Sequence, residues 1–92
     1  MRADLLLFRL RLAKSRALAQ ARIGEGHMRL NGQRLVARDK GVGVGDVLTL
    51  PVGNGVQAVQ IISLPDRRGP PAEARACYRV LDAGGSFAIA EP

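Results

Sequence analysis

The residues that could carry out catalysis are few and scattered. His27 is the only histidine and Cys77 the only cysteine, so neither a metal-binding cluster of these residues nor an internal disulfide can form. Nothing in the sequence pairs the two as base and nucleophile. We interpret Cys77 as a small core residue and His27 as a structural or anion-contacting residue. The eight carboxylates lie apart at helix starts, turns and loops. The sequence predicts no enzyme, no metal and no cofactor.

The cations, in contrast, form a pattern. Residues 1–40 hold ten of the 14 basic residues and three of the eight acidic ones, so they carry a formal charge of +7, whereas residues 41–92 carry −1. A positive field confined to one part of a small domain favours a polyanionic partner. All the cations except Lys14 and Lys40 are arginine, which suits bidentate phosphate contacts. A well-solvated basic surface is the alternative.

Two segments resemble phosphate-binding loops. Lys14, Ser15 and Arg16 precede a predicted helix, where free backbone N–H groups and the helix dipole favour an anion. A plain helix cap with solvated neighbours explains the same residues equally well. The glycine-rich run 41–45 leads into a predicted strand and lacks a following Lys-Ser or Lys-Thr pair, so it does not have the phosphate-cradling pattern.

The elements that position these residues follow from periodicity and turn signals. Apolar spacing predicts helices over 3–13, with Asp4 as a favourable charge at its start, and over 16–25, with Leu18, Ala19 and Ile23 toward the core. Asn31-Gly32 predicts a hairpin between short strands at 28–30 and 33–36. Further strands are expected over 47–50 and 56–64, and a helix from 70 to 81. The fold class is therefore α+β, with two short N-terminal helices packed on a small, mostly antiparallel sheet, then a C-terminal helix.

Length and composition limit the function further. A chain of 92 residues with 47% hydrophobic residues makes one small globular domain. No apolar run approaches the length of a membrane span or a signal peptide, so we expect a cytoplasmic protein. Aromatic residues make up only 3%, too few for a base-stacking surface. This favours the phosphates and shape of folded RNA, and no long recognition helix for a DNA major groove is present.

Three segments of the sequence resemble a known RNA-binding family. They are KSRALAQ at 14–20, EGHMRLNGQR at 25–34 and VGDVL at 44–48. Together they are similar to the S-four RNA-binding domain, whose helix–helix–hairpin unit is called the αL motif. The segment LPDRRGP at 64–70, followed by Ala72, Glu73 and Tyr78, is similar to the heat-shock protein fifteen family within it.

The resemblance implies a ribosome-associated RNA-binding protein. In the heat-shock protein fifteen family the partner is the free large ribosomal subunit carrying tRNA and an unfinished nascent chain, so we expect rRNA, and tRNA as a further partner, with neither a membrane nor a small-molecule substrate. The residues carried over as RNA-binding are Arg2, Arg9, Lys14, Ser15, Arg16, Gln20, His27, Arg29, Asn31, Arg34 and Lys40. We divide the chain into an αL-type RNA-binding domain (1–64), a C-terminal helical extension (65–82) and a tail expected to be flexible (83–92).

Two other functions remain open at this stage. The domain could act in trans as the RNA-binding accessory of an RNA-modifying enzyme, which co-purification would detect. It could also be a generic nucleic-acid-binding regulator or a protein-interaction module, in which case duplex DNA would compete equally with folded RNA.

Overall fold

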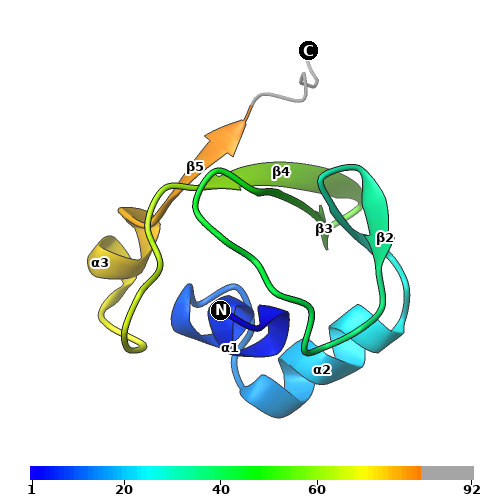
Figure 1. The fold of residues 1–92 in the computed structure, drawn as a ribbon, viewed down its shortest axis with the longest axis horizontal. Helices are drawn as coiled ribbons and strands as arrows, with labels where there is room; N and C mark the ends of the chain where they lie inside the picture. Colours follow the sequence, from blue (N-terminus) through cyan, green and yellow to red (C-terminus); the bar gives the residue numbers. More distant parts are fainter. Residues whose placement is uncertain (82–92) are drawn as a thin grey trace.

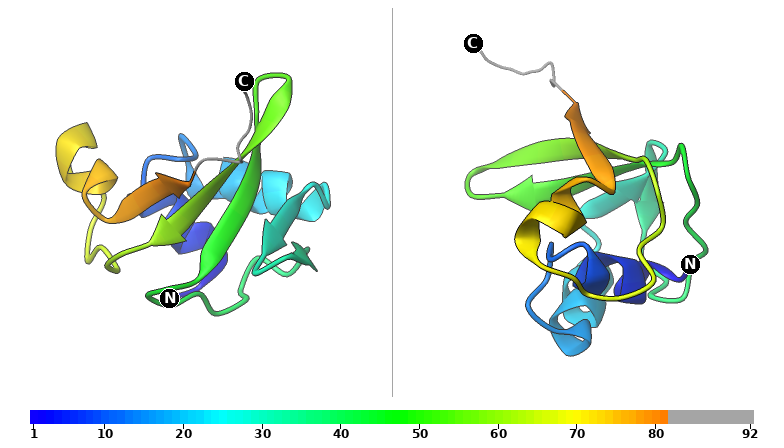
Figure 2. Two further views of the ribbon diagram at one scale, coloured as in Figure 1. Left: turned by 90° about the horizontal axis from the view of Figure 1, so that it is seen from above. Right: turned by 90° about the vertical axis from the view of Figure 1, so that its left-hand side faces the viewer.

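The structure, a computed structural model, describes residues 1–81, in which two helices lie on one face of a single antiparallel sheet. The elements are α1 (Ala3–Arg9), α2 (Arg16–Gly24), β1 (Met28–Leu30), β2 (Gln33–Leu35), β3 (Val47–Val52), β4 (Gly55–Ile61), α3 (Pro71–Arg75) and β5 (Tyr78–Leu81). The strand order is β2-β1-β3-β4-β5. Helices α1 and α2 lie together on one side of the sheet, and α3 lies near its β5 end (Figure 1, Figure 2). The predicted α+β class is confirmed.

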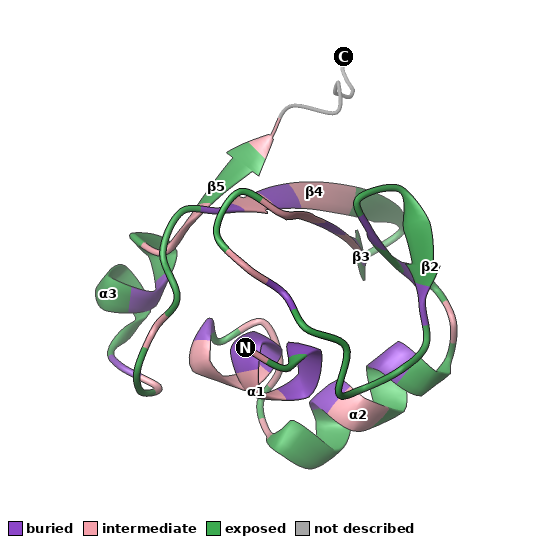
Figure 3. Cartoon of the chain, viewed as in Figure 1, coloured by how far each residue is buried: buried purple, intermediate pink, exposed green. Residues whose placement is uncertain are grey.

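The core lies between these two helices and the sheet face that they cover. Leu48 and Val59 are paired across β3 and β4, and both are fully buried. Leu6 from α1, Leu10 directly after it and Ile23 from α2 are buried in the same core, and Figure 3 shows the buried segments. Removal of this apolar surface from water holds the helices on the sheet. Within residues 1–81, no helix is long and apolar enough to cross a membrane.

Helix α1 ends earlier than its apolar spacing predicts. We expected it to continue to Ala13, but it stops at Arg9 because Arg11 has a left-handed backbone with φ of 59°. The Arg11 N–H then donates to the Phe8 carbonyl at 3.1 Å, and the Leu12 N–H donates to the Leu7 carbonyl at 3.0 Å. This is the Schellman arrangement, in which glycine is the usual left-handed residue. Arginine in that position gives no sequence signal for a helix end.

The C-terminal helix is also shorter than expected. It ends at Arg75 instead of reaching Leu81, because Tyr78–Leu81 pairs with Ala58–Ile61 as strand β5. Aromatic and β-branched residues such as Tyr78 and Val80 favour a strand, and this strand covers what would otherwise be the open edge of β4. Cys77 therefore lies after the helix, partly buried against the core. The predicted tail, 83–92, lies outside the described residues.

The predicted hairpin turn is present, while the bounds of two strands and one core assignment differ from the prediction. Asn31 and Gly32 have φ of 52° and 83°, the paired positive values that a type I′ hairpin needs. Strand β3 runs two residues beyond the predicted end at Leu50, and β4 spans Gly55–Ile61 instead of continuing to Leu64. In α2, Ala19 and Ile23 are buried as expected, but Leu18 is 41% exposed, so its assignment to the core is wrong.

Candidate nucleic-acid interface

A buried carboxylate holds several of the predicted site residues together. Asp4 is fully buried. Its Oδ1 accepts from Arg2 Nε at 2.7 Å and from its neighbour's backbone N–H at 2.8 Å. Its Oδ2 accepts from Arg2 Nη2 at 3.1 Å, from Gln20 Nε2 at 2.9 Å and from Arg16 Nη2 at 3.4 Å. Arg16 and Gln20, four residues apart on α2, therefore both contact the Asp4 carboxylate.

These contacts keep Asp4 ionised. Burial by itself would raise the pKa of this carboxyl group, but hydrogen bonds from Arg2, Gln20 and the Leu5 N–H, together with the charge of Arg2, lower its pKa well below the ordinary value. The same pairing raises the pKa of Arg2. We expected Asp4 only to interact favourably with the start of α1, and its role as a shared acceptor was not predicted.

Arg38 extends this arrangement. Its Nη1 donates to Gln20 Oε1 at 3.2 Å, while its backbone carbonyl accepts from the Asp4 N–H at 3.0 Å. The Lys40 carbonyl similarly accepts from the Ala3 N–H at 2.9 Å, so the loop after β2 caps the start of α1. We call Asp4, Gln20 and the three arginines at positions 2, 16 and 38 the Asp4 cluster. Its formal charge is +2, and Arg38 was not among the predicted site residues.

The β1–β2 hairpin carries a second group of cations. Arg29 and Arg34 are direct partners in the β1–β2 register and both are exposed. Arg29 Nη1 also donates to the Gly32 carbonyl at 3.2 Å. A Cβ added at Gly26 would lie 3.9 Å from Arg34 Cδ, so the stem of Arg34 passes close to the end of α2. His27, exposed, joins α2 to β1.

Asn31 has a structural role at the hairpin. Its Nδ2 donates to Asp46 Oδ1 at 3.1 Å, and its Oδ1 accepts from the Val47 N–H at 2.9 Å. The Asp46 carboxylate also accepts from the Gly43 N–H at 2.8 Å, and these two contacts, Gly43 first, lower the pKa of Asp46. Asn31 therefore fixes the hairpin against the loop that enters β3.

The predicted helix cap before α2 is present. Ser15 Oγ accepts from the Leu18 N–H at 3.1 Å, as an N-cap residue does. Lys14 beside it is exposed. A hollow next to this cap is lined by apolar side chains and three cations. Its lining residues are Arg11, Leu12, Ala13, Lys14, Leu18 and Arg22.

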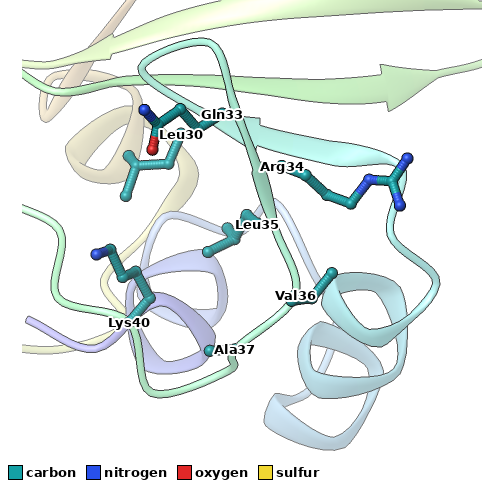
Figure 4. Close-up of a pocket in the computed structure, with 7 residues that line it drawn as sticks. All are labelled: Leu30, Gln33, Arg34, Leu35, Val36, Ala37 and Lys40. Atoms are coloured by element: carbon teal, nitrogen blue, oxygen red, sulfur yellow. The ribbon is translucent and has the colours of Figure 1, made fainter.

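Two predicted site residues, Arg9 and Lys40, lie outside the Asp4 cluster. Arg9 Nη1 donates to the Pro65 carbonyl at 3.0 Å, so it contacts the segment that follows the sheet. Lys40, in the loop after β2, lines the pocket of Figure 4 together with Arg34, and the two side chains point in opposite directions there. RNA contacts by Arg9 and Lys40, as by all the other predicted site residues, stay predictions.

Arg9 is one of three arginines that tie residues 65–69 to α1 and the turn after it. The other two bonds are Arg11 Nε to the Gly69 carbonyl, at 2.6 Å, and Arg68 Nε to the Phe8 carbonyl, at 3.1 Å. The Arg68 guanidinium also lies 4.9 Å from the centre of the Phe8 ring. These arginines thus stabilise the fold, so part of the positive charge of the sequence serves structure and not only a candidate binding surface.

No group of His, Cys, Asp or Glu in the described part of the chain could hold a metal ion. The polar groups of the candidate interface are instead guanidinium groups. They come from Arg2 before α1, from α2, from the β1–β2 hairpin and from the loop after β2. Such groups recognise phosphate through paired N–H donors.

Comparison with known proteins assigns this architecture to a class. Residues 1–48 match the S4 domain family model, and the chain belongs to the S4 domain family. Among solved structures it is similar to heat shock protein 15 of Vibrio cholerae, described as trimeric, with 30% sequence identity and a TM-score of 0.83 over 90% of this chain and 83% of that one. No curated protein sequence matches the chain. The S4 domain and the heat shock protein 15 fold support an RNA-binding, ribosome-associated role.

Proposed function

We propose that this protein is a non-enzymatic, cytoplasmic RNA-binding protein that engages structured rRNA, and also tRNA, on the large ribosomal subunit. Its task there would be the rescue or recycling of subunits that carry a stalled nascent chain. The observation that supports this proposal most directly is the grouping of arginines on α2, on the β1–β2 hairpin and in the segments before α1 and after β2. Five of them, Arg2, Arg16, Arg29, Arg34 and Arg38, come from segments joined by the contacts through Asp4 and Gln20 or by strand pairing.

The proposed mode of binding is electrostatic positioning on phosphates. Arginine side chains and the lysine before the Ser15 cap contact the RNA backbone, which fixes orientation without reading bases. Few aromatic residues are available for stacking, so we expect recognition of RNA shape. The interface of five arginines, Lys14 and His27 would neutralise about five to seven phosphates, which predicts a slope of log affinity against log salt of about −4 to −6.

Co-sedimentation with purified ribosomal subunits tests the proposal. The protein is mixed with large subunits, small subunits, free tRNA or duplex DNA at salt concentrations from about 50 to 300 mM, a range over which phosphate contacts weaken strongly. Selective, salt-sensitive pelleting with the large subunit is the expected result. Equal retention by tRNA and duplex DNA, with no subunit preference, would reduce the function to general polyanion binding and contradict the ribosomal role.

A further inference from the structure

The Asp4 cluster brings three guanidinium groups from distant parts of the chain around one buried acceptor. Arg2 precedes α1, Arg16 begins α2 and Arg38 follows β2. The side chains of Arg2 and Arg16 are each 42% exposed, whereas that of Asp4 has no exposure. The carboxylate therefore lies beneath the guanidinium groups, with their remaining N–H donors on the solvent side.

The cluster holds more donors than its buried acceptor can use. Each guanidinium carries five N–H donors, and Arg16 directs one nitrogen at Asp4 at 3.4 Å. The Arg38 guanidinium is connected to the Asp4 carboxylate only through the Gln20 side chain. Among the described residues, Arg2 and Arg16 form salt bridges with no carboxylate other than Asp4. The cluster thus retains a charge of +2 and unused donors for an external anion.

We infer that the Asp4 cluster is a phosphate-binding subsite, in which Asp4 and Gln20 are positioning residues and Arg2, Arg16 and Arg38 contact one backbone phosphate of the RNA. This inference rests on the proposed RNA-binding function and names a subsite within it. Long arginine side chains normally lose rotamer freedom when they bind. Here much of that ordering is already present in the free protein, because Asp4 and Gln20 hold the guanidinium groups in place.

Removal of the Asp4 charge distinguishes a positioning role for Asp4 from binding that depends only on the net charge of the protein. Asp4→Asn makes the protein more positive by one unit, so general electrostatic attraction predicts tighter RNA binding. The positioning role predicts weaker binding, because the guanidinium groups lose their shared acceptor. The loss of one phosphate contact lowers the affinity about fivefold near 0.15 M salt. It also makes the slope of log affinity against log salt less negative by about 0.7 to 0.9.

Asp39→Asn is the matched control. Asp39 is exposed in the same loop as Arg38 and adds only a Coulombic effect on Arg2. Its neutralisation changes the charge by the same unit, and we expect RNA binding that is unchanged or up to about twofold tighter, as for loss of a weak surface interaction. Weaker binding by Asp4→Asn, without weaker binding by Asp39→Asn, is the result that charge alone cannot produce.

A second variant covers the case in which Asp4→Asn does not fold. Gln20→Met keeps the net charge of the protein and the approximate length of the side chain. It leaves the Arg2–Asp4 salt bridge in place but removes the link between the Arg38 guanidinium and Asp4. It should bind RNA at least about twofold more weakly, with a shallower salt slope, since part of one phosphate contact is lost.

RNA affinity is measured for the full chain and each variant by fluorescence anisotropy with large-subunit rRNA, below the melting temperature of every protein. Binding by the parent protein with unchanged or tighter binding by folded Asp4→Asn would overturn the subsite. If Asp4→Asn is unfolded, unchanged affinity of Gln20→Met would do so. Absence of RNA binding by the parent protein would instead refute the proposed function itself.

Discussion

The pairing of Arg29 with Arg34 predicts that replacement of Arg34 by Gln changes stability and binding in opposite directions. The two residues are opposite each other in the antiparallel β1–β2 register, where Cβ atoms lie about 5 Å apart and like charges destabilise the pair. Both residues are exposed, so solvent and salt reduce the repulsion to about 0.3–0.5 kcal/mol. Arg34→Gln should therefore raise the free energy of unfolding by this amount, or Tm by about 2 °C for a domain of this size.

The same change should weaken RNA binding. Each phosphate contact contributes about 0.7 to 0.9 to the salt slope, which corresponds to about fivefold in affinity, or about 1 kcal/mol, near 0.15 M salt. The prediction for Arg34→Gln is thus a fivefold rise in Kd together with a salt slope that is less negative by nearly one unit. A protein selected for stability alone would not place these two guanidinium groups opposite each other.

Thermal unfolding and anisotropy titrations with structured rRNA test both halves of the prediction. Arg75→Gln is the matched control, because Arg75 is exposed on α3, in the part of the chain without a cationic excess. It should leave the salt slope unchanged. Equal slope changes in the two variants would refute a localised interface. A lower Tm for Arg34→Gln would show that the repulsion argument is wrong.

Three further predictions concern the fold. The lowered pKa values of Asp4 and Asp46 stabilise the folded state fully above the ordinary aspartate pKa near 4. Urea midpoints should therefore fall as the pH decreases below about 4, and less steeply in Asp4→Asn. Arg68→Ala removes the bond to the Phe8 carbonyl and the contact with its ring, and it should cost about 1–2 kcal/mol in chemical denaturation while RNA affinity is retained. Leu48→Ala opens a cavity in the fully buried core and should cost about 2–5 kcal/mol by the same measurement.

The sequence correctly predicted the features that depend only on residues adjacent in the chain. The Ser15 cap and the Asn31-Gly32 turn are each determined by a few adjacent residues, and both are present. The end of α1 was missed because Arg11 takes the left-handed conformation, which usually requires glycine. Its bond to the Gly69 carbonyl joins residues 58 positions apart, and no local pattern contains that partner.

The candidate site was predictable in its residue types and only partly in its geometry. The charge excess of residues 1–40 and the resemblance to the S-four family indicated most of the cations. Arg38 was missed because it depends on tertiary contact with Gln20. Arg9 was carried over from the resemblance to the S-four family, and no local pattern contains its partner in the structure, the Pro65 carbonyl. Charge shows that cations are abundant, while the fold determines which of them converge.

The burial of Asp4 explains how a small domain can concentrate arginines without losing its attraction for a polyanion. A carboxylate on the surface among these arginines would reduce their mutual repulsion, but it would also face the phosphates and repel them. Asp4 instead lies beneath the guanidinium groups, fully buried, with Arg2 and Arg16 still 42% exposed. The hydrogen bonds to Asp4 offset its desolvation. Its negative charge therefore acts from behind the arginines, and the side that faces solvent stays positive.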